Sequence, residues 1–118
     1  MRLTTRTNLA MRALMFCAVN RGRTVRKCDI AESCNASENH MAQVINLLAQ
    51  RRFLATARGR GGGIRLNRPP EEITVGEVFR AFEAGVPFAE CFPGAENTCP
   101  IAPSCRLRGA LADALAAF

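Results

Sequence analysis

The chain has 118 residues, the size of one domain with a single core. No run of about 18 uncharged apolar residues is present, so we expect no membrane span. The first residues lack the apolar stretch and cleavage site of a signal peptide, which predicts a cytoplasmic protein. Six cysteines are too few for a disulfide scaffold of this length, and in a reducing compartment such thiols more often bind metal or act as redox groups.

The net charge of +6 is unevenly distributed along the chain. Residues 1–68 contain thirteen Lys and Arg against three acidic residues, whereas residues 69–118 contain three Arg against seven acidic residues. A basic segment of this kind is typical of a module that binds a polyanion such as DNA, although a solvated basic surface has the same composition. The sequence therefore predicts a DNA-binding module over residues 1–68 and a second part with a different function over residues 69–118.

Apolar periodicity predicts three helices in the basic module. The first covers residues 5–20; a short second helix covers residues 25–34 and is capped by Thr24. The third covers residues 37–52, is capped by Ser37, and follows the second after a tight turn, so the pair forms a helix-turn-helix. The predicted inner faces carry Leu9, Ala13, Phe16 and Cys17, then Val25, Cys28 and Ile30, then Met41, Val44, Ile45 and Leu48.

A basic hairpin is predicted directly after the third helix. Residues 53–58 alternate like a strand, residues 59–63 are rich in glycine, and residues 64–66 form the returning strand. The glycine run lacks the Lys-Ser/Thr of a P-loop, so it is interpreted as a turn. A basic hairpin at this place is typical of the wing of a winged helix, and Pro69-Pro70 marks the end of the module.

The third helix is the predicted recognition helix because it follows the turn and exposes short polar side chains. Asn and Gln suit adenine in the major groove, and arginines suit phosphates or a narrow minor groove. One module of this size binds weakly, so we expect a homodimer on inverted-repeat half-sites of double-stranded DNA, about 34 Å apart or a multiple of that. The residues predicted to contact DNA are Ser37, Asn39, His40, Gln43, Arg51, Arg58, Arg60 and Arg65.

The second part is predicted to consist of two helices around an irregular loop. A capping box at Thr74 and Glu77 starts a helix that runs to about Ala84. Residues 85–103 contain too much proline and glycine for regular structure, and a final helix begins near residue 103 or 104. The residues predicted to face inward on the helix that starts at the capping box are Val75, Val78, Phe79 and Phe82.

Three cysteines, Cys91, Cys99 and Cys105, lie in this loop with the spacing C-x7-C-x5-C. Irregular backbone allows several thiolates to converge on one metal, and thiolates suit an iron–sulfur cluster or zinc. The usual zinc pairs with two to four intervening residues are absent, and a disulfide would leave one cysteine unpaired. The spacing alone leaves these three possibilities open.

Four stretches together are specific for one family. They are the opening MRLTTRTNLAMRAL, the recognition stretch SENHMAQVINLLAQ, the wing RGRGGGIRL and the loop ECFPGAENTCPIAPSCRLRGAL. With them the chain resembles the NsrR/IscR (Rrf-two) family of winged-helix regulators, and within it the NsrR-type nitric-oxide sensors. The resemblance implies a fold that is mainly α with a small β-hairpin: a winged helix-turn-helix, a cluster loop and a C-terminal dimerisation helix.

The resemblance also implies a cofactor and its ligands. Cys91, Cys99 and Cys105 would hold an iron–sulfur cluster, either 4Fe–4S or 2Fe–2S. In four-iron members an aspartate from the first helix of the partner subunit completes the coordination, and the matching position here is Asn8. Arg108 stands where IscR-type members carry a histidine ligand. The dimer seam in the last helix would use Leu107, Leu111 and Leu115.

The function implied by the resemblance is a transcriptional repressor that senses nitric oxide and releases DNA when its cluster is nitrosylated. The alternatives are an iron- or redox-sensing regulator of the same family, and a zinc- or disulfide-stabilised DNA-binding protein without gas sensing. An enzyme is not expected, because no set of nucleophile, base and orienting group is visible and the only histidine, His40, lies on the predicted recognition helix.

Overall fold

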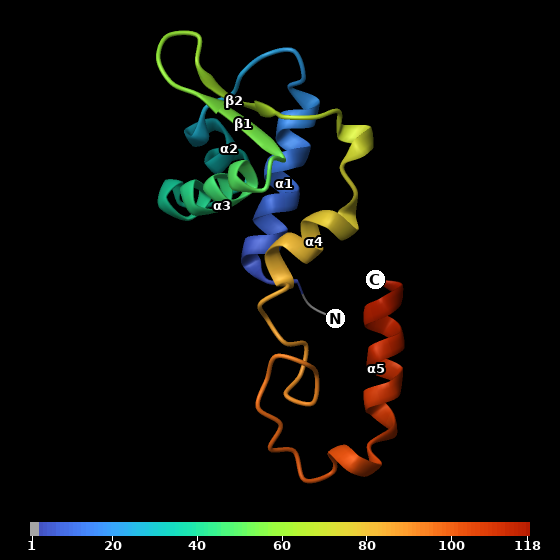
Figure 1. Cartoon of the computed structure of the whole chain (residues 1–118). Coiled ribbons are helices and arrows are strands. Elements are labelled where there is room, and N and C mark those ends of the chain that lie inside the picture. The colour runs from blue at the N-terminus through green and yellow to red at the C-terminus, as the bar shows by residue number, and fades with distance from the viewer. Residues whose placement is uncertain (1–2) are drawn as a thin grey trace. The chain divides into compact units, whose positions relative to one another are not determined.

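The computed structural model describes residues 3–118 and is mainly helical, with one two-stranded hairpin (Figure 1). The chain forms two compact units, one ending at residue 82 and one comprising residues 83–118. This architecture confirms the predicted fold class of a winged helix-turn-helix followed by a loop and a final helix.

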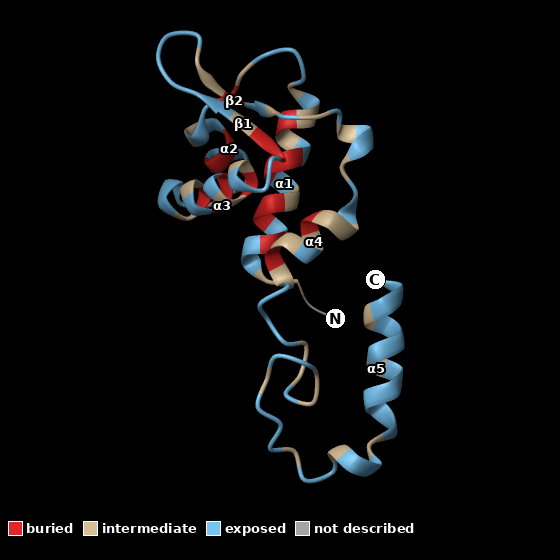
Figure 2. Ribbon diagram, viewed as in Figure 1, coloured by how far each residue is buried: buried red, intermediate tan, exposed pale blue. Residues whose placement is uncertain are grey.

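Helix α1 spans Thr5–Val19, as the apolar periodicity predicts. It begins at Thr4, whose side-chain oxygen accepts a hydrogen bond from the backbone nitrogen of Thr7 at 3.3 Å and so satisfies one free donor of the first turn. One face of α1 is buried in the core of the first unit (Figure 2).

Helix α2, Lys27–Ser33, is shorter than predicted and begins later. The prediction that Thr24 caps it is wrong, because Val25 instead pairs with Ile64 through two backbone hydrogen bonds of 2.9 and 2.8 Å. That pairing keeps Val25 extended and out of the helix. The cap falls at Arg26, whose backbone nitrogen donates to the Asp29 carboxylate at 3.2 Å.

The turn between α2 and helix α3, Glu38–Gln50, has a defined backbone geometry. Asn35 adopts a left-handed conformation with φ of 50°, and Ala36 donates from its backbone nitrogen to the carbonyl of Ala31 at 2.9 Å. Together these features close α2 in a Schellman motif. The oxygen of Ser37 then accepts from the backbone nitrogen of His40 at 3.2 Å, which confirms Ser37 as the cap of α3.

Strands β1, Leu54–Ala57, and β2, Gly63–Leu66, form the antiparallel hairpin. Gly63 has φ of +150°, and a Cβ there would lie 2.9 Å from the carbonyl oxygen of Val25. Only glycine therefore allows β2 to approach the segment before α2 so closely. The contact attaches the wing to the body of the first unit.

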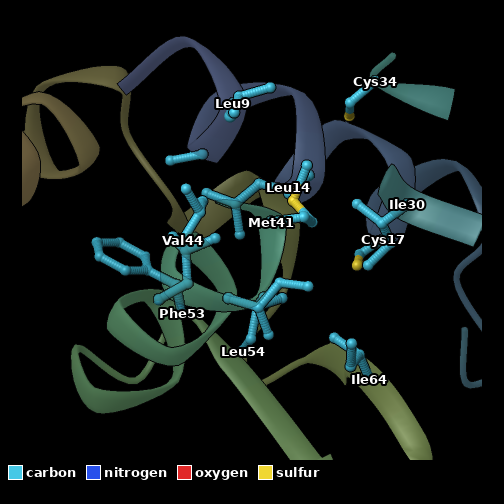
Figure 3. Packing of buried hydrophobic residues seen from close by; sticks show 14 of the residues in the cluster. Leu9, Leu14, Cys17, Ile30, Cys34, Met41, Val44, Phe53, Leu54 and Ile64 are labelled. Atoms are coloured by element: carbon cyan, nitrogen blue, oxygen red, sulfur yellow. The ribbon is translucent and has the colours of Figure 1, made fainter. Parts of the chain in front are cut away.

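One hydrophobic core holds the first unit together. Met41 and Val44 of α3 lie among side chains of α1 and the start of β1, as the close view shows (Figure 3). Each large apolar side chain that is fully removed from water contributes roughly 1.5–3 kcal/mol. The largest fully buried apolar side chains are Ile30, Met41, Val44, Leu48 and Val78.

After the short 3-10 turn Pro70–Glu72, helix α4 spans Val75–Glu83 and starts at the predicted capping box. The backbone nitrogen of Thr74 donates to Glu77 Oε2 at 2.9 Å, and the backbone nitrogen of Glu77 donates to Thr74 Oγ1 at 3.2 Å. Val78 and Phe82 are buried, whereas Val75 is 61% exposed and the prediction that it faces inward is wrong. The buried face of α4 begins one turn later, at Val78.

The first compact unit thus extends beyond the predicted boundary at residues 68–69, because Val78 and Phe82 of α4 join its core. The predicted boundary concerns where the DNA-binding module ends, and that functional division stays a prediction. No helix within residues 3–118 is both long enough and apolar enough to cross a membrane.

In the second unit an irregular segment leads to the 3-10 turn Ala102–Ser104 and to helix α5, Arg106–Ala117. The proline-rich loop and the final helix therefore lie close to where the sequence predicts them. None of the residues of α5 is buried; Leu111 and Leu115 are half-buried, and Leu107 is 62% exposed. The apolar side of α5 is thus left largely open to solvent within this chain.

Candidate functional site

The exposed face of α3 presents a row of amide side chains. Asn39 and Gln43 are exposed, as predicted, while His40 is half-buried. Asn46 and Gln50 are exposed as well and continue the same face one and two turns further on. The sequence interpretation missed these last two residues, although their spacing from Gln43 follows the helical period. The four amides form what we call the amide row: Asn39, Gln43, Asn46 and Gln50.

Arginines lie at the end of α3 and along the wing. Arg51 is the C-cap of α3, and Arg58 and Arg60 lie in the loop between β1 and β2. Arg65 extends from β2, and all four side chains are exposed. In Figure 1 the hairpin loop and α3 both extend away from α1 in the same direction. The end of α3 and the hairpin thus carry four exposed positive charges.

Backbone contacts fix the hairpin to the end of α3. Arg52 adopts a left-handed conformation with φ of 63°, and the backbone nitrogen of Phe53 donates to the carbonyl of Leu48 at 2.9 Å. Asn67 donates from its side chain to the carbonyl of Arg52 and from its backbone to the carbonyl of Phe53, both at 3.0 Å. The two ends of the hairpin are therefore closed on the C-terminal end of α3.

Arg68 adds a charged contact beneath this junction. Its guanidinium lies 5.2 Å from the centre of the Phe53 ring and donates to Glu77 Oε1 at 3.1 Å. Glu77 has a lowered pKa, first because the backbone nitrogen of Thr74 donates to its carboxylate and then because Arg68 does so. The carboxylate of Glu77 thus links Arg68, at the base of the wing, to the first turn of α4.

The three loop cysteines lie in the second unit. Cys91, Cys99 and Cys105 are free thiols and are half-buried. The backbone nitrogen of Cys99 donates to Asn97 Oδ1 at 3.1 Å, and Cys105 is the N-cap of α5. Within residues 3–118 no three His, Cys, Asp or Glu side chains are grouped closely enough to hold a metal ion. The structure places the three thiols on one segment but does not bring them together.

As a set of donors, these cysteines fit an iron–sulfur cluster. They supply three thiols that are not committed to disulfides and are partly accessible. Cys91 and Cys99 lie on a segment that is neither helix nor strand. Such a segment can bend so that its thiols converge on one metal. Binding would require this loop to rearrange from the conformation described here.

The remaining cysteines have different surroundings. Cys17 and Cys34 are buried, and burial raises the pKa of Cys17 to about 11, with Cys34 adding to the effect. Burial also raises the pKa of Cys34, partly offset by the nearby positive charge of Arg12. Both are protonated core thiols at neutral pH. Cys28, which the sequence predicts on an inner face, is only half-buried.

Asn8 lies on α1, in the first unit, and is exposed. Arg108 lies on α5 and is exposed too. The predicted role of Asn8 involves a second subunit, so it stays a prediction.

A helix-turn-helix followed by a basic hairpin that is closed on the recognition helix defines the winged-helix class of DNA-binding proteins. The Rrf2 family, described as "Iron-dependent Transcriptional regulator", matches residues 3–118. Two relatives support the match. The chain is 43% identical over 119 residues to the HTH-type transcriptional regulator NsrR of Bacillus subtilis, covering all of this chain and 82% of the relative. It is 42% identical over 118 residues to protein aau3 of Rhizobium meliloti, covering all of this chain and 77% of the relative.

Solved structures agree with the fold. The global cysteine regulator CymR of B. subtilis superposes with a TM-score of 0.72 at 22% identity, covering 98% of this chain and 86% of that one. IscR of T. potens superposes with a TM-score of 0.71 at 22% identity, covering 98% of this chain and 77% of that one. The chain belongs to the Rrf2 family. It is a DNA-binding transcriptional regulator and not an enzyme.

Proposed function

We propose that the protein is a homodimeric, cytoplasmic repressor that senses nitric oxide through an iron–sulfur cluster held by Cys91, Cys99 and Cys105. The observation that carries the proposal is the placement of three free, half-buried thiols on one irregular segment directly before an open α5. The NsrR-named relatives, about 40% identical over the whole chain, support the same function. When bound, the cluster supplies iron that reacts with nitric oxide.

DNA recognition is assigned to the amide row and the wing. Asn39 and Gln43 would contact base edges in the major groove, with adenine as the base that suits an amide best. Ser37 and His40 lie at the same end of α3 and would contact the adjacent backbone or bases. Phosphates or a narrow minor groove would be bound by Arg51, Arg58, Arg60 and Arg65.

Dimerisation is assigned to α5. Its apolar side chains recur at helical spacing, yet none of them is buried in this chain, so a second copy provides the missing partner. A two-fold dimer would place its recognition helices on inverted half-sites about one or more helical turns of DNA apart. The seam residues are Leu107, Leu111 and Leu115.

The link between cofactor and dimer runs through Cys105, the N-cap of α5. A change in the order of the loop therefore alters the first turn of the helix that joins the subunits. Such a change needs a coupling free energy of only about 1–3 kcal/mol to alter DNA affinity 5–150-fold.

Asn8 of the partner subunit is proposed to face the cluster as a weak fourth ligand. A neutral amide binds iron less strongly than a carboxylate does. The variant Asn8→Asp should therefore retain its iron and visible absorbance longer in air than the parent protein. An unchanged decay of absorbance would remove Asn8 from the site.

The deciding experiment is anaerobic purification with counts of iron and sulfide, followed by DNA titration with and without nitric oxide. The proposal expects stoichiometric iron and sulfide and weaker DNA binding after exposure. Stoichiometric zinc, or neither iron nor sulfide, would favour the structural alternative without sensing. Full cluster occupancy with DNA binding that responds to iron supply or oxidant, but not to nitric oxide, would favour the iron- or redox-sensing alternative.

A further inference from the structure

A cleft of about 450 Å³ opens between the segment after α1 and the outgoing end of β2. It lies entirely within the first unit and has no residue in common with the cysteine loop. Its volume falls in the range of about 300–1,000 Å³ that is usual for sites of small ligands. Its charged lining consists of four arginines, Arg21, Arg23, Arg65 and Arg68.

Two of these arginines are neutralised by carboxylates. Arg21 pairs with Glu71 at 3.2 Å, and Arg68 pairs with Glu77 at 3.1 Å. Arg23 instead donates from both Nε and Nη2 to the neutral amide oxygen Oδ1 of Asn20, with Nε at 3.1 Å. Among residues 3–118, no carboxylate forms an ion pair with Arg23 or Arg65. Two guanidinium groups in the cleft lining thus retain uncompensated positive charge.

The rest of the lining favours a small anion with an organic part. Leu66, Pro69 and Pro70 give the cleft an apolar wall, and Cys17 contributes a buried thiol. Because this thiol is protonated at neutral pH, it does not repel an anion. The lining also includes the polar residues Thr24 and Asn67, so it offers hydrogen-bonding groups beside the apolar wall.

We propose that this cleft binds a small phosphate-bearing anion, gripped by Arg23 and Arg65. One edge of a guanidinium can donate to two phosphate oxygens at once; in Arg23 this is the edge that does not face Asn20. Two cations balance a phosphate dianion. The phosphate belongs either to a free small molecule or to the DNA backbone, and the chemistry of recognition is the same in both cases. Where the ligand is the DNA backbone, the inference rests on the DNA-contacting role proposed above for Arg65; in neither case does it depend on the cluster or on nitric oxide.

Occupation of the cleft would connect the body of the unit to the wing. Arg23 precedes Thr24, whose hydroxyl donates to the carbonyl of Gly62 at 3.3 Å, and Val25 is bridged to Ile64 in β2. Arg65 follows Ile64 on the other side of this bridge. An anion held by both arginines would therefore cross-link the two walls next to the wing.

The first arm of the test is calorimetric titration of the full chain with pyrophosphate, at an ionic strength kept constant with chloride. Wild type should bind saturably, and Arg23→Gln and Arg65→Gln should each weaken binding at least about tenfold, equivalent to about 1.4 kcal/mol. Arg23→Lys keeps the positive charge but lacks the planar guanidinium, so it should bind pyrophosphate with intermediate affinity. Arg80→Gln, an exposed arginine of α4 outside the cleft, is the matched control and should bind like wild type.

The second arm measures the affinity for a random DNA duplex as a function of salt for the same variants. If the cleft holds a DNA phosphate, Arg23→Gln should reduce the slope of log affinity against log salt by about one, while Arg80→Gln does not. An unchanged slope together with weakened pyrophosphate binding would identify a free phosphate compound as the ligand. Circular dichroism establishes that each variant is folded.

The proposal is overturned if pyrophosphate binds wild type and both glutamine variants equally. It is overturned as well if pyrophosphate does not bind and Arg23→Gln leaves the salt slope unchanged. Neither result bears on the iron–sulfur proposal, because neither arm uses the cluster or nitric oxide.

Discussion

The side-chain amide of Asn67 donates a hydrogen bond of 3.0 Å to the carbonyl oxygen of Arg52, which joins the exit of the wing to the corner that follows α3. Arg52 is held in a left-handed conformation that non-glycine residues rarely adopt. The bond therefore stabilises a strained corner from which the wing departs. The direction of the wing relative to α3 depends on this corner.

Substitution Asn67→Ala should consequently impair DNA binding more than folding. Loss of one largely exposed hydrogen bond should lower the free energy of unfolding by about 0.5–1.5 kcal/mol, measured by urea denaturation. DNA affinity should fall further, because a looser wing no longer presents Arg58 and Arg60 together with α3. Equal affinity of variant and parent for DNA would show that this corner does not determine the orientation of the wing.

The sequence predicts a structural feature well when the residues that form it lie close together in the chain. The capping box at Thr74 and the cap at Ser37 are predicted correctly because donor and acceptor lie three residues apart. The start of α2 is missed because Val25 pairs with Ile64, a partner far along the chain. The Asn67–Arg52 bond is missed for the same reason.

The candidate site follows the same rule. The amide row lies on one regular helix, so its spacing predicts a shared face, and only its last two members are missed. The gathering of Cys91, Cys99 and Cys105 has no such periodic signal, since most of the segment that carries them is irregular. Their common role is therefore inferred from thiol chemistry and from the resemblance to a family, and not from spacing.

The amide row and the wing should differ in what they contribute to DNA binding. Gln43→Ala should relax the base preference at one position, with a loss of about 1–3 kcal/mol on the preferred sequence and little loss on others. Arg60→Ala should weaken binding on all sequences and flatten the salt dependence. Fluorescence anisotropy on a panel of duplexes at several salt concentrations checks both. Uniform losses for Gln43→Ala would instead indicate contact with the DNA backbone.

Cys91→Ala, Cys99→Ala and Cys105→Ala should each lose most of the bound iron and the response to nitric oxide together. Removal of one thiolate from three leaves too few protein ligands for a stable cluster. The matched control is Cys28→Ala, which removes a half-buried thiol of the first unit and should keep full iron content. Iron and sulfide analysis of anaerobically purified protein measures the result. Retention of full iron by any of the three loop variants contradicts the assignment.

Glu77 should make folding stability depend on pH in the acidic range. Its pKa is lowered in the folded protein, first by the hydrogen bond from the backbone nitrogen of Thr74 and then by Arg68. A carboxyl group with a lowered folded-state pKa stabilises the protein above its unfolded value of about 4.3, and this stabilisation disappears as pH falls through the folded value. Glu77→Gln should therefore have a lower Tm than the parent at pH 7, and the difference should shrink as pH falls below the unfolded value of about 4.3. Thermal melts followed by circular dichroism at pH 3 to 7 test this, with Glu72→Gln as an exposed control that has no part in the capping box. A difference in Tm that stays constant down to pH 3 would mean that the charge of Glu77 does not stabilise the start of α4.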